Sequence, residues 1–320
     1  MKPVLVTGAT GFLGRHLVRE LVSRGVAVRA LCRTKSDFPK SVEVVLGDVT
    51  SAADVKRAMD GTSQVYHLAG MVSRDPKDAS RLRQVHVDGT RHVCDAASHL
   101  KIPRLVYASS SGTIAISRDP VMHTEDSPYK ESIASRWPYY VTKIEAEKLA
   151  EQYPFVITLN PSLLLGPGDD RGSSTGDVKA LLERQILSLP TGGLSFVDVR
   201  DCAVAAIAAM ERGRPKQRYL LGSANWDFVQ FSKAVSQASG VNVPFMKSPT
   251  WLSLLAAPVL RRVMPLLGRK FDIDDASIEM AGLFWYCDWS KATRELGFTP
   301  RDPMETIRDT VNDIRSRQPQ

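Results

Sequence analysis

The chain has 320 residues, 43% of them hydrophobic and 24% charged, which predicts a globular protein with one α/β domain and a smaller appendage. Its net charge of +7 comes from scattered basic residues, and no basic block with interleaved aromatic residues indicates nucleic-acid binding. The four cysteines lack metal-ligand spacing, which indicates buried thiols in a reducing compartment and no metal site.

Targeting and membrane-spanning segments are not expected either. The first apolar strand begins at residue 4, which leaves no room for a signal peptide. The longest apolar stretch, 251–260, is about half as long as a membrane span and ends at Arg261 and Arg262. We therefore expect a cytoplasmic protein without an integral membrane segment.

The first predicted elements are a strand at residues 4–6 and a helix from Phe12, joined by a turn that contains Gly8 and Gly11. A dinucleotide pyrophosphate needs this order, because glycines allow a tight turn and close backbone approach, and the helix N-terminus attracts the anion. An ordinary glycine-rich turn is the alternative. The position directly after the first strand and before a helix favours dinucleotide binding.

The second and third strands bear on which dinucleotide binds. The second strand, 26–32, ends at Arg33, and an arginine here favours the 2′-phosphate of NADP over the ribose of NAD. A solvated surface arginine is the alternative. Asp48 follows the third strand, 42–46, and can accept a bond from the adenine amino group, cap the predicted helix 51–59, or do both.

Strands continue to alternate with helices further along the chain. Strands at 65–68 and 105–108 flank a long helix at 79–100. This alternation predicts a doubly wound parallel sheet of the Rossmann type, with helices on both faces. His67 has no acid or nucleophile at a suggestive spacing, so we interpret it as a structural residue at a strand end.

A tyrosine–lysine pair and a serine run supply the candidate chemistry. Pro138 opens a predicted helix in which Tyr139 and Lys143 share one face, and Ser110 follows the fifth strand. A plain surface pair is the alternative for Tyr139 and Lys143. Both features lie at the sheet edge where the glycine turn is expected. There Tyr139 can move a proton on the substrate oxygen, Lys143 can favour the phenolate and bind the nicotinamide ribose, and Ser110 can hold the substrate oxygen.

The second half of the chain predicts the remaining elements. Strands are expected at 156–159, 195–199 and 219–221, and helices at 201–211 and 228–239. The composition then shifts to a strongly apolar helical stretch, 251–267, and an aromatic cluster, 284–289. We interpret 251–267 as the core of a small lobe, with contact to a membrane surface as the alternative.

Taken in order, these motifs resemble the extended short-chain dehydrogenase/reductases of the NAD-dependent epimerase/dehydratase superfamily, over nearly the whole chain. The motifs that carry the resemblance are Thr7-Gly8-Ala9-Thr10-Gly11-Phe12-Leu13-Gly14, Gly47-Asp48-Val49, His67-Leu68-Ala69-Gly70, Ser109-Ser110-Ser111 and Tyr139-x-x-x-Lys143. Residues 107–113, 160–169 and 196–201 look most like the dihydroflavonol 4-reductase and 3β-hydroxysteroid dehydrogenase-like branch.

The resemblance implies a role for each candidate site residue. Tyr139 is the acid–base, Lys143 its partner and Ser110 the catalytic serine, with Ser111 as the alternative because counting back from Thr113 shifts the match by one. The implied cofactor is NADP, with NAD as the alternative. The implied cofactor-binding residues are Gly8, Thr10, Gly11, Phe12, Leu13, Arg33, Asp48, Val49, Leu68, Ala69, Gly70, Tyr139, Lys143, Pro161 and Ser162. In this family the long helix and the Tyr139 helix commonly form a dimer interface, so the resemblance also implies a homodimer.

Some departures from the family pattern bear on the substrate. Sugar-nucleotide members carry arginines at the position of Asn160 and near 192–195, where this chain has none. An apolar roof from residues 251–286 agrees with a less polar substrate, although Arg261, Arg262 or Arg269 could substitute. His86 stands in place of an asparagine, which we interpret as a local packing change.

We therefore predict an NADP-dependent oxidoreductase that interconverts a ketone and a secondary alcohol on a fairly apolar small molecule. The alternatives are an NAD-dependent nucleotide-sugar epimerase or dehydratase, and a cofactor-binding protein without catalysis. We expect residues 1–165, rejoined by 195–221, to form the nucleotide-binding domain. Residues 166–194 and 222–320 are expected to form the smaller substrate-binding lobe.

Overall fold

Seven parallel strands form the larger sheet of the computed structural model, which describes residues 2–244, 246–268, 271 and 273–317. The strand order is β3-β2-β1-β4-β5-β6-β9. These strands are β1 (Val4–Thr7), β2 (Val28–Cys32), β3 (Val42–Leu46), β4 (Gln64–His67), β5 (Leu105–Ala108), β6 (Val156–Pro161) and β9 (Arg218–Leu221). The order reverses beside β1, so the predicted doubly wound Rossmann sheet is confirmed.

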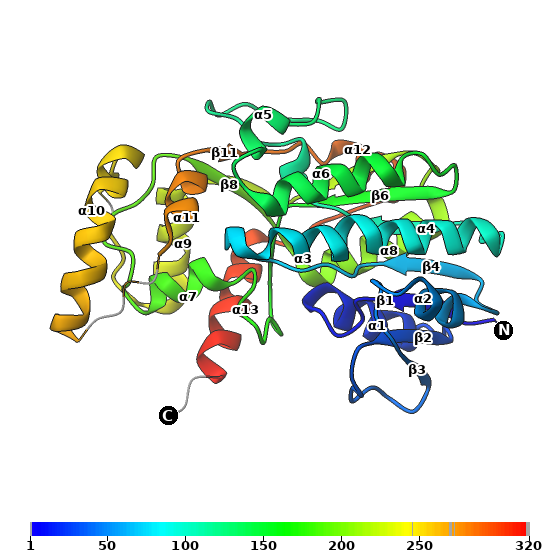
Figure 1. Cartoon of the computed structure of the whole chain (residues 1–320). Coiled ribbons are helices and arrows are strands. Elements are labelled where there is room, and N and C mark those ends of the chain that lie inside the picture. The colour runs from blue at the N-terminus through cyan, green and yellow to red at the C-terminus, as the bar shows by residue number, and fades with distance from the viewer. Residues whose placement is uncertain (1, 245, 269–270, 272, 318–320) are drawn as a thin grey trace.

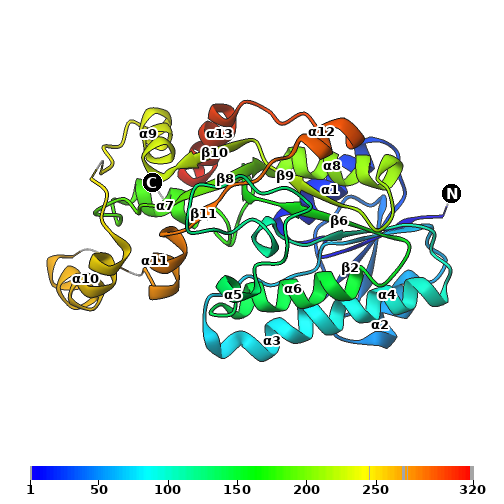
Figure 2. The same cartoon turned by 90° about the horizontal axis from the view of Figure 1, so that it is seen from above.

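Helices cover both faces of this sheet, as Figure 2 shows from above. One face carries α1 (Phe12–Ser23), α8 (Val199–Arg212) and α12 (Ser290–Leu296). The other carries α2 (Ala52–Met59), α4 (Gly89–His99) and α6 (Pro138–Ala150). Side chains of β1 alternate between the two layers: Val4 and Val6 pack towards α1, and Leu5 packs in the layer of α2 and α4. A sheet buried on both faces needs apolar residues at every position, which explains the unbroken apolar runs.

A second, smaller sheet lies beyond the carboxyl ends of the large one (Figure 1). Its strands are β7 (Leu163–Leu165), β8 (Gly193–Asp198), β10 (Ala224–Asp227) and β11 (Phe284–Trp285), and the helices packed around it are α7 (Gly176–Leu182), α9 (Phe228–Ser239) and α13 (Pro303–Ser316). Residues 195–198, expected with the nucleotide-binding part, instead pair with β7 and β10 in this sheet. The chain returns to the large sheet only with α8 and β9.

The outermost part of the lobe is a pair of helices at the left of Figure 1. They are α10 (Thr250–Val263), continued by the short helix η4 (Met264–Leu267), and α11 (Asp275–Ala281). Only Ala257 of α10 is buried. The interpretation of this apolar stretch as lobe core is therefore wrong for most of the helix. None of the helices in the described parts of the chain has the length and apolar character that crossing a membrane requires.

The predicted long helix at 79–100 contains a break in its regular hydrogen bonding. It consists of α3 (Ala79–Arg83), a π-helical turn η2 (Gln84–Asp88) and α4, and a short turn η1 (Pro76–Asp78) precedes it. Two other short helices, η3 (Ser111–Thr113) and α5 (Glu131–Ala134), lie between β5 and α6. Such π turns are rare and are frequently found at functional sites. This one places His86 in the interior, with 1% of its surface exposed.

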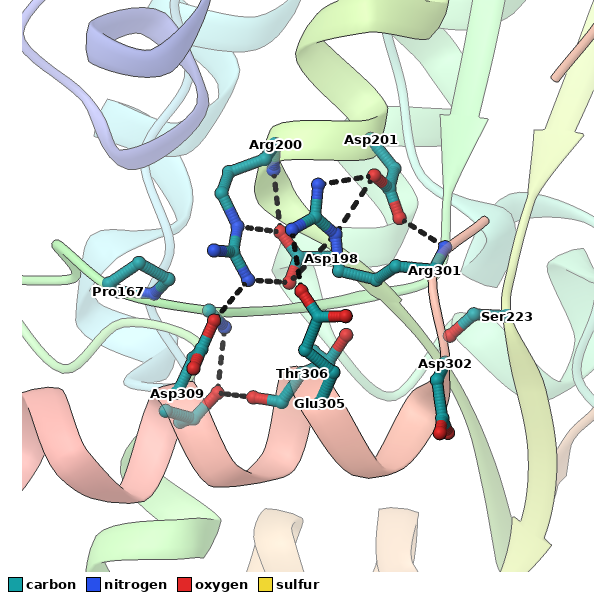
Figure 3. Close-up of polar contacts among 12 residues, drawn as sticks. Pro167, Asp198, Arg200, Asp201, Ser223, Arg301, Asp302, Glu305, Thr306 and Asp309 are labelled. Atoms are coloured by element: carbon teal, nitrogen blue, oxygen red, sulfur yellow. Dashed lines mark hydrogen bonds and ion pairs between the residues drawn. The ribbon is translucent and has the colours of Figure 1, made fainter. Parts of the chain in front are cut away.

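An ion-pair network links the end of β8 and the start of α8 to the C-terminal helix α13 (Figure 3). Asp198 ends β8, has no exposed side-chain surface, and accepts bonds from the backbone and guanidinium of Arg200. Arg301 donates to Asp201 at 2.8 Å and lies 3.5 Å from Asp198, and Arg200 also donates to Asp309 of α13. The segment 196–201, which carried part of the family resemblance, therefore connects β8 and α8 to the C-terminal helix.

Replacing Arg301 by alanine should lower the free energy of unfolding by about 2 kcal/mol at neutral pH, since charged hydrogen bonds to Asp201 are lost. Burial raises the pKa of Asp198, but hydrogen bonds from Arg200 and the charges of Arg200 and Arg301 outweigh it and hold the pKa below its usual value. The difference in free energy of unfolding between wild type and Arg301→Ala should thus be complete above about pH 4. It should shrink as the pH falls through that lowered pKa. Urea unfolding at several pH values measures this.

The matched control is Arg308→Ala, on the exposed side of α13. Its stability should stay within about 0.5 kcal/mol of wild type. Equal stability losses in Arg301→Ala and Arg308→Ala would show that the network of Figure 3 contributes nothing specific.

Candidate active site

The glycine turn after β1 forms a cradle that fits a pyrophosphate. Gly8 has a φ of +70°, and a Cβ atom there would lie 2.6 Å from the Ala69 backbone nitrogen. A Cβ on Gly14 would lie 2.1 Å from the Gly8 carbonyl oxygen. Helix α1 starts after Gly11 without a side-chain cap on its first N–H groups. The sequence therefore leaves these donors open to an anion, whereas α2 is capped by Ser51.

Two predicted adenosine contacts lie beyond β2 and β3. Arg33 immediately follows β2 and is exposed. Asp48 is half-buried, and its Oδ1 accepts bonds from the backbone and hydroxyl of Thr50, both at 3.0 Å. The expectation that Asp48 caps the following helix is wrong, because Ser51 accepts the bond from the Asp54 backbone. Val49 is buried beside them.

The other predicted cofactor-binding residues follow β4 and β6. Leu68 and Ala69 are half-buried, and Gly70 is exposed. A Cβ on Gly70 would lie 3.6 Å from both His86 Nε2 and Lys143 Nζ, so the backbone passes directly beside these two side chains. Pro161 ends β6 and is buried. The adjacent Ser162 hydroxyl is buried and has no protein partner among the described residues, which suits a donor to a bound ligand.

The structure brings Ser110, Tyr139 and Lys143 together at the same edge. Ser110 is the second residue after β5, and its Oγ accepts a bond from the Gly112 backbone at 3.2 Å, which leaves its hydroxyl hydrogen free to donate. Tyr139 and Lys143 lie one turn apart on α6, which begins at Pro138 as predicted. Lys143 Nζ donates to the Ala108 carbonyl at 3.0 Å.

The two candidate serines differ in their surroundings. Ser110 is half-buried, and its side chain lowers the pKa of the Tyr139 phenol, against the larger effect of burial. Ser111 is 5% exposed and begins η3, where its carbonyl accepts the Ala115 backbone N–H at 2.8 Å. The placement favours Ser110 as the serine that meets a substrate at Tyr139.

Burial controls the charges at this site. It raises the pKa of Tyr139 to about 12, against the hydrogen bond with Ser110, which lowers it. Burial also lowers the pKa of Lys143 to about 8, against the charge of Glu147, which raises it. At neutral pH the phenol is protonated, which is the state that a proton donor needs.

Two uncharged histidines flank Lys143. His67 bonds Thr7 Oγ1 at 2.7 Å and Thr90 Oγ1 at 3.1 Å, and burial lowers its pKa to about 3. This agrees with a structural role. Burial and the charge of Lys143 also hold the pKa of His86 far below its usual value.

His86 does more than fill a packing position. Its Nε2 accepts the Met71 backbone N–H at 3.1 Å, so its Nδ1 carries the proton and donates to Thr142 at 2.9 Å. Its ring meets that of Tyr139 edge-on, with centroids 5.5 Å apart. His86 therefore ties the backbone beyond Gly70 to the catalytic helix. Sequence reasoning missed this contact because it depends on the π turn.

Glu147 is a second residue that the sequence analysis missed. It lies one turn beyond Lys143, is fully buried, and accepts a bond from the Ser109 hydroxyl. Its Oε2 lies 2.9 Å from both Thr113 Oγ1 and Asn160 Nδ2. Asn160 also donates to the Ser110 carbonyl at 3.1 Å. Asn160, at the position where the family resemblance expects arginine in sugar-nucleotide members, thus joins Glu147 to the loop 109–113, here called the serine loop.

Aromatic rings line the side of the site that faces the lobe. Tyr140 lies next to Tyr139, with ring centroids 4.9 Å apart, and Trp285 of β11 lies 5.1 Å from Tyr140. Gly112 makes room for both, because a Cβ there would lie 2.2 Å from the Tyr140 ring. The expected apolar roof therefore reaches the site through β11. Arg261 donates instead to the Ile273 carbonyl and Asp275, Arg262 is exposed on α10, and Arg269 lies outside the described residues.

A Rossmann sheet with an open glycine cradle, and a Tyr–Lys helix at its ligand-binding edge, defines an NAD(P)-dependent oxidoreductase. The chain matches the "NAD dependent epimerase/dehydratase family" over residues 4–222, and it belongs to this family. The resemblance predicted from the motifs is confirmed.

Named relatives cover nearly the whole chain. A putative dihydroflavonol 4-reductase of Synechocystis sp. is 32% identical over 96% of this chain and 93% of its own length. Sterol demethylase protein B of Methylococcus capsulatus is 30% identical over 98% of both chains. The crystal structure of gox2253 superimposes with a TM-score of 0.84, at 27% identity, over 99% of this chain and 98% of that one.

Proposed function

We propose that this chain is an NADPH-dependent reductase of a ketone on a fairly apolar small molecule, working reversibly on the secondary alcohol. The observation that carries this proposal is the aromatic side of the site, where Tyr140 and Trp285 lie beside Tyr139. Similarity to a dihydroflavonol reductase and a sterol-processing protein supports it. The substrate would bind between the Rossmann sheet and the smaller lobe.

Each proposed role follows from the local geometry. The bound reduced nicotinamide supplies a hydride to the carbonyl carbon. Ser110 donates its free hydroxyl hydrogen to the carbonyl oxygen and polarises it. Tyr139 then transfers its phenolic proton to that oxygen, which completes the alcohol. Lys143 holds a positive charge beside Gly70, where it can bind the nicotinamide ribose and stabilise the phenolate left after transfer.

The direct test is a screen of alicyclic and aromatic ketones with purified protein and NADPH, following absorbance of the cofactor. Turnover of an apolar ketone supports the proposal. The purified protein could instead already hold NAD and turn over a nucleotide sugar without net oxidation. That result would reject the reductase proposal in favour of the epimerase or dehydratase alternative.

Arg33 provides a test of the cofactor assignment. We expect tighter binding of NADPH than of NADH in a fluorescence titration, because an arginine directly after β2 favours the 2′-phosphate. Arg33→Ala should weaken NADPH binding about tenfold and leave NADH binding nearly unchanged. The control is Arg24→Ala, at the far end of α1. A wild-type preference for NADH would overturn the assignment of NADP.

The reduction rate should depend on the charge of Lys143. Because burial lowers the pKa of Lys143 to about 8, its ammonium form prevails below that pH and is lost above it. We expect kcat/KM for ketone reduction to be level at neutral pH and to fall above about pH 8. A kcat/KM that stays level to pH 10 would show that the reduction does not depend on the charge of Lys143.

We also propose that two copies pair through the outer face of α4 and α6, which lie side by side in Figure 1. Analytical ultracentrifugation of the purified protein tests this directly.

A further inference from the structure

We propose that α10 is a membrane-surface helix, which seats the smaller lobe on a lipid bilayer that contains anionic lipids. This inference does not rest on the proposed reaction. It begins from exposed apolar side chains concentrated in one short segment. Of the thirteen large hydrophobic residues that are exposed in the described chain, seven lie between residues 246 and 266: Met246, Trp251, Leu252, Leu255, Val259, Val263 and Leu266.

The exposed residues of α10 form one continuous stripe. At about 100° per residue, positions 251, 252, 255, 259 and 263 fall within an arc of about 120°. Trp251 is 64% exposed, Leu255 69% and Val259 61%. Leu266, at 84%, extends the apolar surface into the short helix that follows. A surface helix of a globular protein normally packs such an apolar face against the protein core.

The core-facing side of α10 is already occupied. Ala257 and Met264 are buried against Phe271, and Ile278 of α11 packs on the same cluster. Arg261, which lies across the helix from the stripe, pairs with Asp275 at the start of α11. The lobe therefore holds α10 from one side and presents the apolar stripe outwards, at the outer end of the molecule in Figures 1 and 2.

The charge around the stripe suits an anionic surface. The sequence from 241 to 270 contains five basic residues and no acidic one. Arg262 is exposed and falls on the same side of the helix as the stripe, near its C-terminal end. The acidic residues that follow in the sequence are Asp272, Asp274 and Asp275. Asp272 lies outside the described residues, and Asp274 and Asp275 belong to the start of α11, on the opposite side of α10. Apolar residues on one face with flanking arginines are typical of helices that lie in a membrane interface, and Trp251 suits that position.

The length of the helix excludes a spanning arrangement. The 14 residues of α10 extend about 21 Å, whereas the hydrocarbon layer is about 30 Å thick. A second copy of the chain is the competing occupant. Symmetric pairing of two stripes would bring the Arg262 side chains of both copies to one interface, which costs free energy, whereas anionic lipid headgroups attract them.

Vesicle co-sedimentation of the full-length protein tests the inference. We expect binding to vesicles of phosphatidylcholine mixed with phosphatidylglycerol, and weaker binding to phosphatidylcholine alone or at high salt. Leu255→Asp combined with Val259→Asp should lower the partition coefficient at least about tenfold. Arg262→Gln should lower it about fivefold on the mixed vesicles only.

The matched control is Val204→Asp, an exposed valine on α8 at the far side of the molecule, which should leave vesicle binding unchanged. Circular dichroism and NADPH binding establish that each variant is folded. Absence of wild-type binding to both kinds of vesicle would overturn the inference. So would a dimer in ultracentrifugation without lipid that is lost in the Leu255→Asp, Val259→Asp variant, because the stripe would then be covered by a second copy.

Discussion

Tyr139→Phe should lower kcat for ketone reduction about 1,000-fold, which is the usual contribution of a positioned proton donor. The phenyl ring keeps the packing against Tyr140 and His86 and removes only the hydroxyl. Because burial keeps the phenol protonated at neutral pH, its proton is available to the substrate oxygen. Steady-state kinetics with NADPH and a substrate from the ketone screen measures the loss, and the affinity for NADPH should change little.

Tyr140→Phe is the matched control, since it removes a hydroxyl from the neighbouring ring on the same helix and should leave kcat nearly unchanged. A Tyr139→Phe variant with wild-type turnover would require another proton donor. The serines can be separated in the same assay: Ser110→Ala should lower kcat about 100-fold and Ser111→Ala much less. The reverse order would assign the substrate contact to Ser111.

Local sequence spacing was sufficient to predict the cofactor cradle and the Tyr–Lys pair. The cradle depends on Gly8, Gly11 and Gly14 within one turn and the start of one helix, where the backbone geometry follows directly from the residues. Tyr139 and Lys143 are likewise neighbours on one helix. The parallel sheet followed from the alternation of strands and helices, and the order of its strands agrees with the doubly wound pattern.

Contacts that depend on distant segments could not be predicted in the same way. Glu147 stands four residues after Lys143, but its partners come from the serine loop and from β6. His86 acquires its contacts with Met71 and Tyr139 through a π turn, which hydrophobic periodicity does not indicate. The apolar composition of α10 did not reveal how much of it is buried, because a core helix and a membrane-surface helix have similar amounts of apolar sequence.

The strand at 193–198 shows a related limit of sequence patterns. Its residues are all buried, as they would be in the Rossmann sheet, so the apolar run alone does not decide which sheet it joins. Asp198 at its end pairs with Arg200, which also pairs with Asp309, and this links the end of β8 to α13. Pairing with β7, the strand that follows β6 closely in the chain, then places β8 in the smaller sheet.

Glu147→Ala should lower the free energy of unfolding by about 3–5 kcal/mol, the usual cost of removing one partner from a buried charge network. Arg218 lies 3.6 Å from the carboxylate and is mostly buried, so it would lose the more buried of its two carboxylate partners and keep only Glu151, at 3.8 Å. The hydroxyl of Ser109 and the amide of Asn160 would lose a shared acceptor. The midpoint of urea unfolding, followed by circular dichroism, measures the effect.

Glu145→Ala is the control for Glu147→Ala, because Glu145 lies on the same helix with an exposed carboxylate paired to Arg83 and should change stability by less than about 1 kcal/mol. Glu147→Gln tests the role of charge at nearly constant volume, and its loss should lie between those of the two alanine variants. Because Asn160 also holds the Ser110 carbonyl, Glu147→Gln should lower kcat more than it changes the affinity for NADPH. A Glu147→Ala protein as stable as Glu145→Ala would show that the buried network under the serine loop does not stabilise the fold.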